Sequence, residues 1–557
     1  MLRLIALLGL LATVVSGSQV TFADLNVPWD APPHLDSTDN SLFSAVNSLL
    51  QRWPNTLYKN GASSMLCGNI CFYTFPTTGH TIIPATMPIG TLLYHGHTVE
   101  GVPSVLEWVA LDFEHAYLFC RQGPCYVVSF ITTRDLRLAY FDGSSAIKWG
   151  NGTLDTQDML TWGEPLSGRC TDEIQRIKNL CAWGKTFGLD GFVRMSYNFE
   201  VMVCDFSAGL KVVSVQNHLP KSVPELESED DDLKYQPQSN PRPSAQTEEK
   251  PCPPMSRSSA IGPQPDPPGG WKGSLPEGYT FDFQPLVTGS WRNRSPGETR
   301  MHVDYSGLVT FYDTALASLI VSRRGVPRGH HRLLGISAND SARVHAELAE
   351  VFGRQTRGSG VDWGSVTRLI VERYAGRLET LRYTLEPVAT FNLNATQQAA
   401  LVRFQFLTML VPYMTTDSVP TNASWTSSIV ERCSTPSTSL IPASLLTPQE
   451  RRIQGSVQGT LHEICRRLTV MWVDAFDIEA ASEERAVVAL ENWRVHVKEL
   501  MDWLGWSVWV DCNPACNPDA MCYLPSWPSF REGDIQDDMT PRCISSVSRA
   551  GQPTIWV

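Results

Sequence analysis

Three short stretches near the start of the chain carry side chains that could bind and cleave a small molecule. Residues 90–96 read Gly-Thr-Leu-Leu-Tyr-His-Gly, so an apolar strand ends at His95 and Gly96. A glycine at that point lets a ligand approach the backbone closely. Residues 107–120 begin as a strand carrying Trp108 and then turn into a helix, and residues 197–206 place Glu200 at the start of a third strand.

In order and spacing, these stretches resemble the ADP-ribosyltransferase fold of the poly(ADP-ribose) polymerase and diphtheria-toxin branch. The resemblance covers residues 90–205, with His95 in place of the family's first-strand histidine and Glu200 in place of its third-strand glutamate. Trp108 stands where the family has tyrosine, so an aromatic face is kept and the phenol is lost. The resemblance implies NAD as a substrate held by His95, Gly96 and Trp108, catalysis by His95, Trp108 and Glu200, and no other cofactor.

The chemistry of these side chains agrees with that expectation. Cleaving the nicotinamide–ribose bond builds positive charge on the ribose, and a fixed carboxylate such as Glu200 stabilises that charge in a dry site. His95 could hold a ribose hydroxyl, while Trp108 would stack on the departing ring. The competing interpretation is structural: a strand-end histidine, a core tryptophan and a surface glutamate.

Two other function classes remain open. A secreted glycoside hydrolase would need a pair of carboxylates with tryptophan platforms for the sugar. Its candidates are Asp112, Glu114, Asp190, Glu200 and Asp205. A non-catalytic extracellular binding or structural protein is the third class. The chain lacks the Gly-x-Ser-x-Gly elbow, the Walker loop and the His-Glu-x-x-His helix, which disfavours the enzymes that use them.

Over its whole length the chain also resembles a family of uncharacterised secreted proteins from filamentous fungi. The residues that carry this likeness are 141–146, 152–158, 188–195 and 304–313. The likeness implies a secreted glycoprotein and points to no activity.

Charge argues against one class of partner. The formal net charge is −12, whereas a nucleic-acid scaffold needs clustered Lys and Arg, so no nucleic-acid partner is expected. His95 and His97 alternate on one strand and could start a metal site, but no third ligand accompanies them.

The N-terminus predicts export. Residues 1–17 combine a basic start, a short apolar run and small residues at the end, which is typical of a cleaved signal peptide. No later stretch reaches transmembrane length, so we expect a secreted, extracellular protein without stable membrane insertion. Sequons for N-glycosylation lie at Asn151, Asn293, Asn339, Asn394 and Asn422.

The 557 residues exceed what one core supports, so several domains are expected. Composition predicts an α+β domain over 18–216, a disordered acidic and Pro-rich linker over 217–278, and a mainly helical domain over 279–505. A small Cys-rich tail follows over 506–557. Helices are expected over 341–352 and 397–411, and around the apolar patterns at 461–472 and 487–504.

An even number of cysteines behind an export signal predicts disulfides. The candidates are all fourteen: Cys67, Cys71, Cys120, Cys125, Cys170, Cys181, Cys204, Cys252, Cys433, Cys465, Cys512, Cys516, Cys522 and Cys543. We expect the tail's four to pair internally, with zinc as the runner-up, and Cys433 to pair with Cys465. The first domain holds an odd number, which leaves one to pair with Cys252 or stay free.

Overall fold

The computed structural model describes residues 29–52, 79–120, 124–146, 152–166, 169, 172–218, 287–355, 358–387, 393–415, 424–512, 514–518, 520–523 and 541–545. The predicted signal peptide lies outside these residues, and so does the predicted linker apart from residues 217 and 218. The chain divides into two compact units, an α+β unit (residues 44–368 and 505–557) and a helical unit (residues 1–43 and 369–504). The predicted fold class is confirmed: an α+β part, a mainly helical part and a small disulfide-rich tail.

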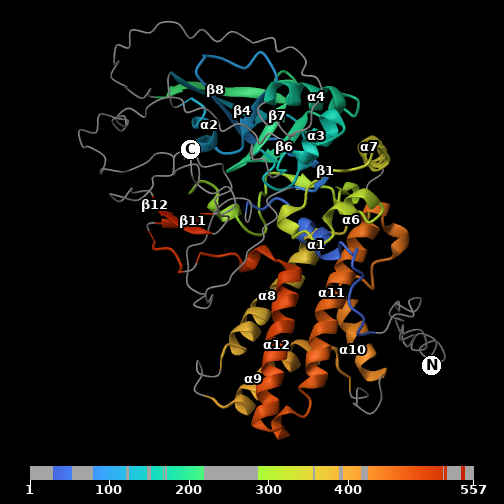
Figure 1. The fold of residues 1–557 in the computed structure, drawn as a ribbon. Helices are drawn as coiled ribbons and strands as arrows, with labels where there is room; N and C mark the ends of the chain where they lie inside the picture. Colours follow the sequence, from blue (N-terminus) through green and yellow to red (C-terminus); the bar gives the residue numbers. More distant parts are fainter. Residues whose placement is uncertain are drawn as a thin grey trace, which may run out of the picture. The chain divides into compact units, whose positions relative to one another are not determined.

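One sheet organises the α+β unit (Figure 1). It is a ten-stranded half-barrel with the order β10-β1-β5-β6-β7-β3-β2-β4-β8, and β9 pairs with β1. Among these described strands only β5 and β6 pair in parallel. The strands are β1 Thr81–Met87, β2 Leu92–His97, β3 Glu107–Ala110, β4 Cys125–Thr132, β5 Leu136–Phe141, β6 Gly191–Met195, β7 Phe199–Val203, β8 Leu210–His218, β9 His302–Val303 and β10 Val309–Thr310.

Helices cover the centre of this sheet. Helix α4 (Glu173–Lys185) lies beside α3 (Asp155–Trp162) and buries Ile177 and Leu180 against Phe192 and Met202 of β6 and β7. It begins at Glu173, after Asp172, and ends at Lys185. The disulfide Cys181–Cys204 ties α4 to the end of β7. The short helix α2 (Phe113–Tyr117) packs on β2, and the disulfide Cys120–Cys125 follows it.

The boundary predicted at residue 279 differs from the structure. Strands β9 and β10 both pair with β1, so the chain that follows the predicted linker completes the sheet before the second segment of the helical unit begins at residue 369. Helices α6 (Ala317–Arg323) and α7 (Ala338–Gly353) also belong to the α+β unit. Strands of two residues are too short to show the alternation that reveals a strand in a sequence, so only tertiary pairing defines them.

The helical unit contains α9 (Ala395–Leu410), α10 (Ser424–Ser434), α11 (Pro448–Asp474) and α12 (Glu483–Leu504), with most of α8 (Trp363–Thr384) and the first half of α1 (Asp39–Ser48). The apolar spacing in the sequence had predicted helices within α9, α11 and α12. Figure 1 shows α9, α11 and α12 alongside one another. Helix α11 begins at a capping box made by Thr447 and Glu450. The predicted disulfide Cys433–Cys465 joins α10 to α11.

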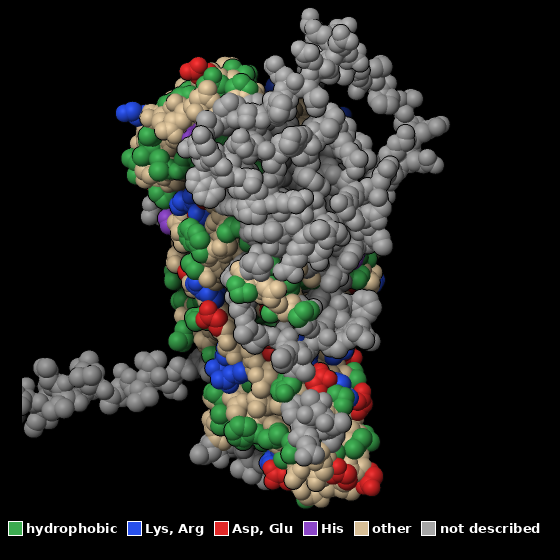
Figure 2. Space-filling model, turned by 90° about the vertical axis from the view of Figure 1, so that its left-hand side faces the viewer, with side chains coloured by type: hydrophobic (Ala, Val, Ile, Leu, Met, Phe, Trp, Pro, Cys, Tyr) green, Lys and Arg blue, Asp and Glu red, His purple; other side chains and the backbone are tan. Residues whose placement is uncertain are grey.

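The described surface carries mixed charge. On the face seen in Figure 2, Lys and Arg side chains are scattered among Asp, Glu and apolar side chains and do not gather into one patch. No helix among the described residues is both long and apolar enough to cross a bilayer.

Candidate functional site

A cavity opens where the sheet splits between β2 and β3. The two strands share one bridge, Tyr94↔Ala110, while β2 continues to pair with β4 and β3 with β7. Beyond this bridge lies a cavity of about 540 Å³, within the usual size range of small-molecule sites. His95, Gly96, Trp108 and Glu200, all singled out from the sequence, line this one cavity.

His95 enters the cavity as a neutral acceptor. Its Nδ1 lies 2.5 Å from the carbonyl oxygen of Trp108. A carbonyl only accepts hydrogen bonds, so Nδ1 carries the proton and donates it. Burial lowers the pKa of His95 to about 4, which keeps the ring neutral at pH 7. Nε2 is therefore left with a lone pair that can accept a hydroxyl or N–H group of a ligand.

Glu200 is the ionised group of the cavity. It is the second residue of β7 and only 5% exposed. Its Oε1 accepts a bond of 2.6 Å from Arg194 Nε, and its Oε2 lies 3.4 Å from His115 Nε2. Burial alone would raise the pKa of this carboxyl, but the Arg194 charge and the bond from His115 hold the pKa at about 2. Glu200 is a carboxylate throughout the physiological range.

Behind Glu200 runs a chain of buried ion pairs, here called the Glu200 cluster. Arg194 also binds Glu173 at 2.7 Å, Glu173 binds Arg176 at 2.7 Å, and Arg176 binds Asp158 at 2.9 Å. Three carboxylates thus share two guanidinium groups, with His115 as a further partner of Glu200. Burial raises the pKa of Asp158, at the far end of the cluster, to about 6. Sequence reasoning missed Arg194, although an arginine inside the apolar run of β6 signals a buried carboxylate partner.

The mouth of the cavity is apolar, with one half-buried carboxyl. Val99, Val105 and Phe119 line it and are 66%, 63% and 62% exposed. Glu107, the first residue of β3, also lines it, and burial raises the pKa of this carboxyl. Two carboxyl groups whose pKa values are displaced in opposite directions therefore share one cavity, the arrangement that enzymes use for acid and base roles.

Gly96 has a different reason to be glycine from the one expected. A Cβ at this position would overlap the carbonyl oxygen of Ala116 in α2. The space beside Gly96 is thus taken by the backbone of α2, and the missing side chain lets that helix pack closely on β2. This contact brings His115 of α2 within reach of Glu200.

A second group of buried charges, here called the Asp112 cluster, fixes the start of α2. Asp112, the residue before the helix, binds Arg292 at 2.5 Å and Arg300 at 3.2 Å. Glu298 joins both arginines, and buried Arg52 lies close enough to interact with Asp112. Burial would raise the pKa of Asp112, yet the bond from Arg292 and the nearby charges hold it below its usual range.

The five carboxylates considered for sugar hydrolysis do not converge. Glu200 is the only one of them that lines the cavity. Asp190 is held by two bonds from Arg134, of 2.8 and 2.6 Å, and Asp205 accepts the backbone N–H and hydroxyl of Ser207. A carboxyl pair at this cavity would instead combine Glu200 with Glu107 or Glu173, neither of which the sequence had suggested.

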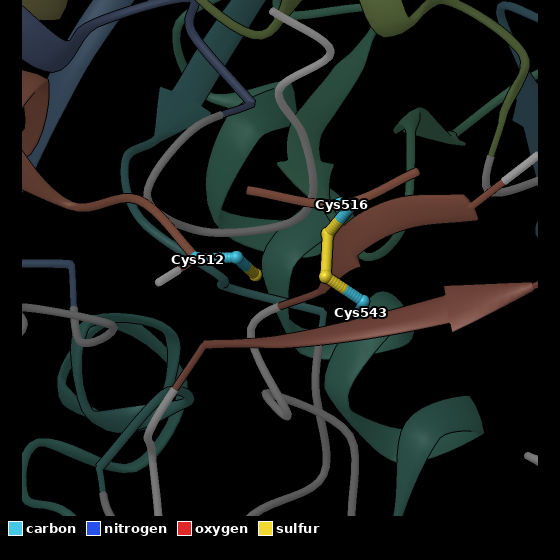
Figure 3. Close-up of side chains that lie close together, drawn as sticks. All are labelled: Cys512, Cys516 and Cys543. Atoms are coloured by element: carbon cyan, nitrogen blue, oxygen red, sulfur yellow. A yellow bond between two sulfur atoms is a disulfide. The ribbon is translucent and has the colours of Figure 1, made fainter. Parts of the chain in front are cut away.

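The tail cysteines are the one candidate metal group found among the described residues. Potential ligand atoms of Cys512, Cys516 and Cys543 lie within 4.8 Å of one another (Figure 3). Disulfides Cys512–Cys522 and Cys516–Cys543 consume these thiols, and zinc requires thiolates. The tail therefore pairs internally as expected. Among the described residues, His95 and His97 belong to no group of three possible metal ligands.

Five disulfides connect described cysteines, which indicates an oxidising compartment. Cys67, Cys71, Cys170 and Cys252 lie outside the described residues, so the pairing predicted for the odd cysteine stays a prediction. Among the sequons, Asn339 and Asn394 are exposed and Asn293 is buried, while Asn151 and Asn422 lie outside the described residues.

Comparisons with known proteins link the chain to two relatives. A family model described as the YPL277C N-terminal domain matches residues 74–128 and 121–227, a span that contains the whole cavity. Uncharacterized protein YOR389W of Saccharomyces cerevisiae is 24% identical over 551 residues, covering 88% of this chain and 82% of its own length. Uncharacterized protein YPL277C of the same yeast is 29% identical over 221 residues, covering 30% of this chain and 41% of its own length.

The chain is thus homologous to these yeast proteins, whose names state no activity. No solved structure matches the chain. The resemblance to ADP-ribosyltransferases gains no support from these comparisons.

Proposed function

We propose that the α+β unit cleaves the bond between a ribose and a cationic nitrogen base, with NAD⁺ as the reference substrate, as a glycohydrolase or transferase. The observation that carries the proposal is the convergence of His95, Trp108 and Glu200 on one cavity. They come from three neighbouring strands, β2, β3 and β7, at the point where the sheet splits.

Each side chain has a role that its surroundings support. When the C1′–N bond breaks, its electron pair leaves with the base, and positive charge develops on C1′ and the ring oxygen of the ribose. Glu200 is ionised, buried and fixed by Arg194 and His115, so it stabilises this charge without reorganising. Nε2 of His95 accepts a ribose hydroxyl and orients the sugar. Trp108 lines the same cavity and would contact the aromatic base beside the Arg194 guanidinium, which lies 5.6 Å from the centroid of the tryptophan ring.

Attack by water or an acceptor hydroxyl completes the reaction. The oxygen bonds to C1′, and its proton must pass to a base. Glu107 suits this role because it lines the same cavity and burial raises its pKa toward the working range. Hydrolysis of NAD⁺ thus gives ADP-ribose, neutral nicotinamide and one proton.

The test is nicotinamide release from NAD⁺ by the purified mature protein, measured by chromatography. Glu200→Gln should lower kcat by ~10²-fold or more with little change in binding, because the carboxylate acts mainly in the transition state. His95→Ala should also raise KM, because it positions the sugar in the ground state. The matched control is Glu114→Gln on α2, which neighbours His115 but does not line the cavity, and it should behave like the parent. Turnover that is unchanged in Glu200→Gln would place the chemistry elsewhere.

Hydrolysis of a glycoside bond is a second candidate that one observation favours. Glu107, with its raised pKa, would act as the acid, and Glu200, with its lowered pKa, as the carboxylate partner. Glu107→Gln separates the two reactions. A cationic base leaves without protonation, so its cleavage should depend on Glu107 less steeply than release of a sugar alkoxide. Cleavage of polysaccharides without nicotinamide release would decide for the glycosidase.

A further inference from the structure

The side chains that line the cavity carry more negative than positive charge. Four carboxyl groups line it, those of Glu100, Glu107, Glu173 and Glu200, against one guanidinium, that of Arg194. Arg194 is already bound to two of these carboxylates, at 2.6 and 2.7 Å. The described lining therefore offers a ligand surplus negative charge and no uncommitted Lys or Arg.

The N-terminus of helix α4 does not supply the positive charge that the lining lacks. Helix α4 starts at the cavity, and backbone N–H groups at such an end commonly bind phosphate. Its first residue, however, is Glu173, whose carboxylate occupies the position where an anion would be favoured and binds Arg176 and Arg194. A phosphate brought to this point would meet a carboxylate of like charge.

A positively charged ligand, in contrast, fits the charges of this cavity. Exposed Glu100 and half-buried Glu107 lie at the apolar mouth, and Glu200 lies at its buried end. A cationic aromatic ring entering past the exposed Val99 and Val105 buries apolar surface, and its positive charge faces carboxylates along the way. The guanidinium over the Trp108 ring is that of Arg194, 5.6 Å from the ring centroid, and Glu173 and Glu200 already neutralise it. A dinucleotide would have to carry its diphosphate past the same carboxylates.

Resting on the proposed function, we propose that the preferred substrates of this cavity are ribosides of cationic pyridine bases that lack a diphosphate, such as nicotinamide riboside. Water adds to C1′ while the C1′–N bond breaks and its electron pair leaves with the ring. The cationic riboside and water thus give ribose, neutral nicotinamide and a proton. No oxidant or further cofactor is needed.

The experiment compares nicotinamide riboside with NAD⁺ as substrates of the full mature protein across ionic strength. For the riboside kcat/KM should exceed that for NAD⁺ by at least ~10-fold at low salt, because the lining attracts the cation and repels the diphosphate. Added salt should bring the two kcat/KM values closer together, since screening weakens both the attraction of the cation and the repulsion of the diphosphate. Glu100→Lys should also bring them closer together, because it removes a negative charge from the mouth and adds a positive one. The control Glu164→Lys changes charge at an exposed residue that does not line the cavity and should leave the ratio unchanged.

The possible results separate this inference from the proposed function. Faster cleavage of NAD⁺ than of the riboside, or equal cleavage at every salt concentration, would overturn the substrate assignment and leave the glycohydrolase proposal intact. Cleavage of neither compound by a folded protein would overturn both. A riboside preference that Glu100→Lys does not change would show that the charges of the mouth are not its cause.

Discussion

Two clusters of buried charge lie within the α+β unit, and only one of them borders the cavity. The Glu200 cluster has three carboxylates and two guanidinium groups, and its end forms part of the cavity wall. The Asp112 cluster has two carboxylates and three guanidinium groups, and none of its members lines the cavity. Burial and ion pairing are common to both, so neither property by itself marks a functional site.

The sequence positions of the paired residues also differ. The Glu200 cluster joins α3, α4, β6 and β7, which lie close together in the chain. The Asp112 cluster joins residues 52, 112 and 292–300, and Arg52 donates a further bond of 2.8 Å to the backbone carbonyl of Tyr197. Helix α2 connects the two, because Asp112 precedes it and His115 lies within it. We infer that the Asp112 cluster holds the framework in which the Glu200 cluster acts.

Asp112→Ala tests whether the Asp112 cluster holds the framework, and it should lower the free energy of unfolding more than any other variant considered. Removing the carboxylate takes one of two buried acidic partners from Arg292 and Arg300 and leaves only Glu298 to pair with both. Breaking such a buried pair typically costs ~3–5 kcal/mol of unfolding free energy. Denaturant unfolding of the variant measures the loss. Glu350→Ala is the matched control, because its pair with Arg354 is 60% exposed at the glutamate and should contribute ~0–1 kcal/mol.

The turnover of Asp112→Ala gives a second test of the framework role. If the Asp112 cluster is only a framework, the fraction of Asp112→Ala that remains folded at low temperature should keep most of its turnover. Equal stability of the Asp112 and Glu350 variants would show that α2 is held by something else.

The sequence predicted the parts of the site that depend on local pattern. Apolar strand-like runs predicted the strands that carry His95, Trp108 and Glu200, and the resemblance to ADP-ribosyltransferases singled out the three residues. Helical spacing located α9, α11 and α12. Cysteine counting found the pairing of the tail. Each of these signals lies within a few turns or strands of chain, where side-chain period and propensity dominate.

What the sequence did not reveal depends on distant pairing. Nothing near Asp112 indicates that its partners are Arg292 and Arg300, nor that β9 and β10 complete the sheet. The divergence of β2 and β3 after one bridge is a consequence of their different partners, β4 and β7. Arg194 is the exception: an arginine in an otherwise apolar strand could have indicated the carboxylates that surround it.

Acid should weaken the stabilising contribution of the buried Glu200 carboxylate. The pKa of Glu200 falls from 4.5 to about 2 on folding. Its ionised form therefore stabilises the fold above pH 4.5, and this contribution is lost as pH falls toward 2. At pH 3 about 2 kcal/mol of it should be gone. The stability difference between parent and Glu200→Gln should thus be larger at pH 7 than at pH 3.

Denaturant unfolding of both proteins at the two pH values measures this change. Glu114→Gln, on the same helix as His115 but outside the cavity, serves as the control and should show a nearly constant difference. A Glu200 difference that does not change between pH 7 and pH 3 would contradict the strong ion pairing assigned to this carboxylate.

The smallest effect is expected for Gly96→Ala, which acts on the helix that connects the two clusters. The added Cβ would overlap the carbonyl oxygen of Ala116, so α2 must move away from β2. Overpacking typically costs ~1–3 kcal/mol, and the lower end is expected because α2 has only five residues. Gly353→Ala at the end of α7 meets no atom within 4 Å, so it should be neutral or slightly stabilising.

Turnover gives a second reading of the same variant. Since the shift of α2 would carry His115 away from Glu200, Gly96→Ala should lower kcat by more than its small loss of stability explains. Unchanged turnover at reduced stability would instead show that the contact of His115 with Glu200 does not matter to the reaction, and Arg194 alone would then position the carboxylate.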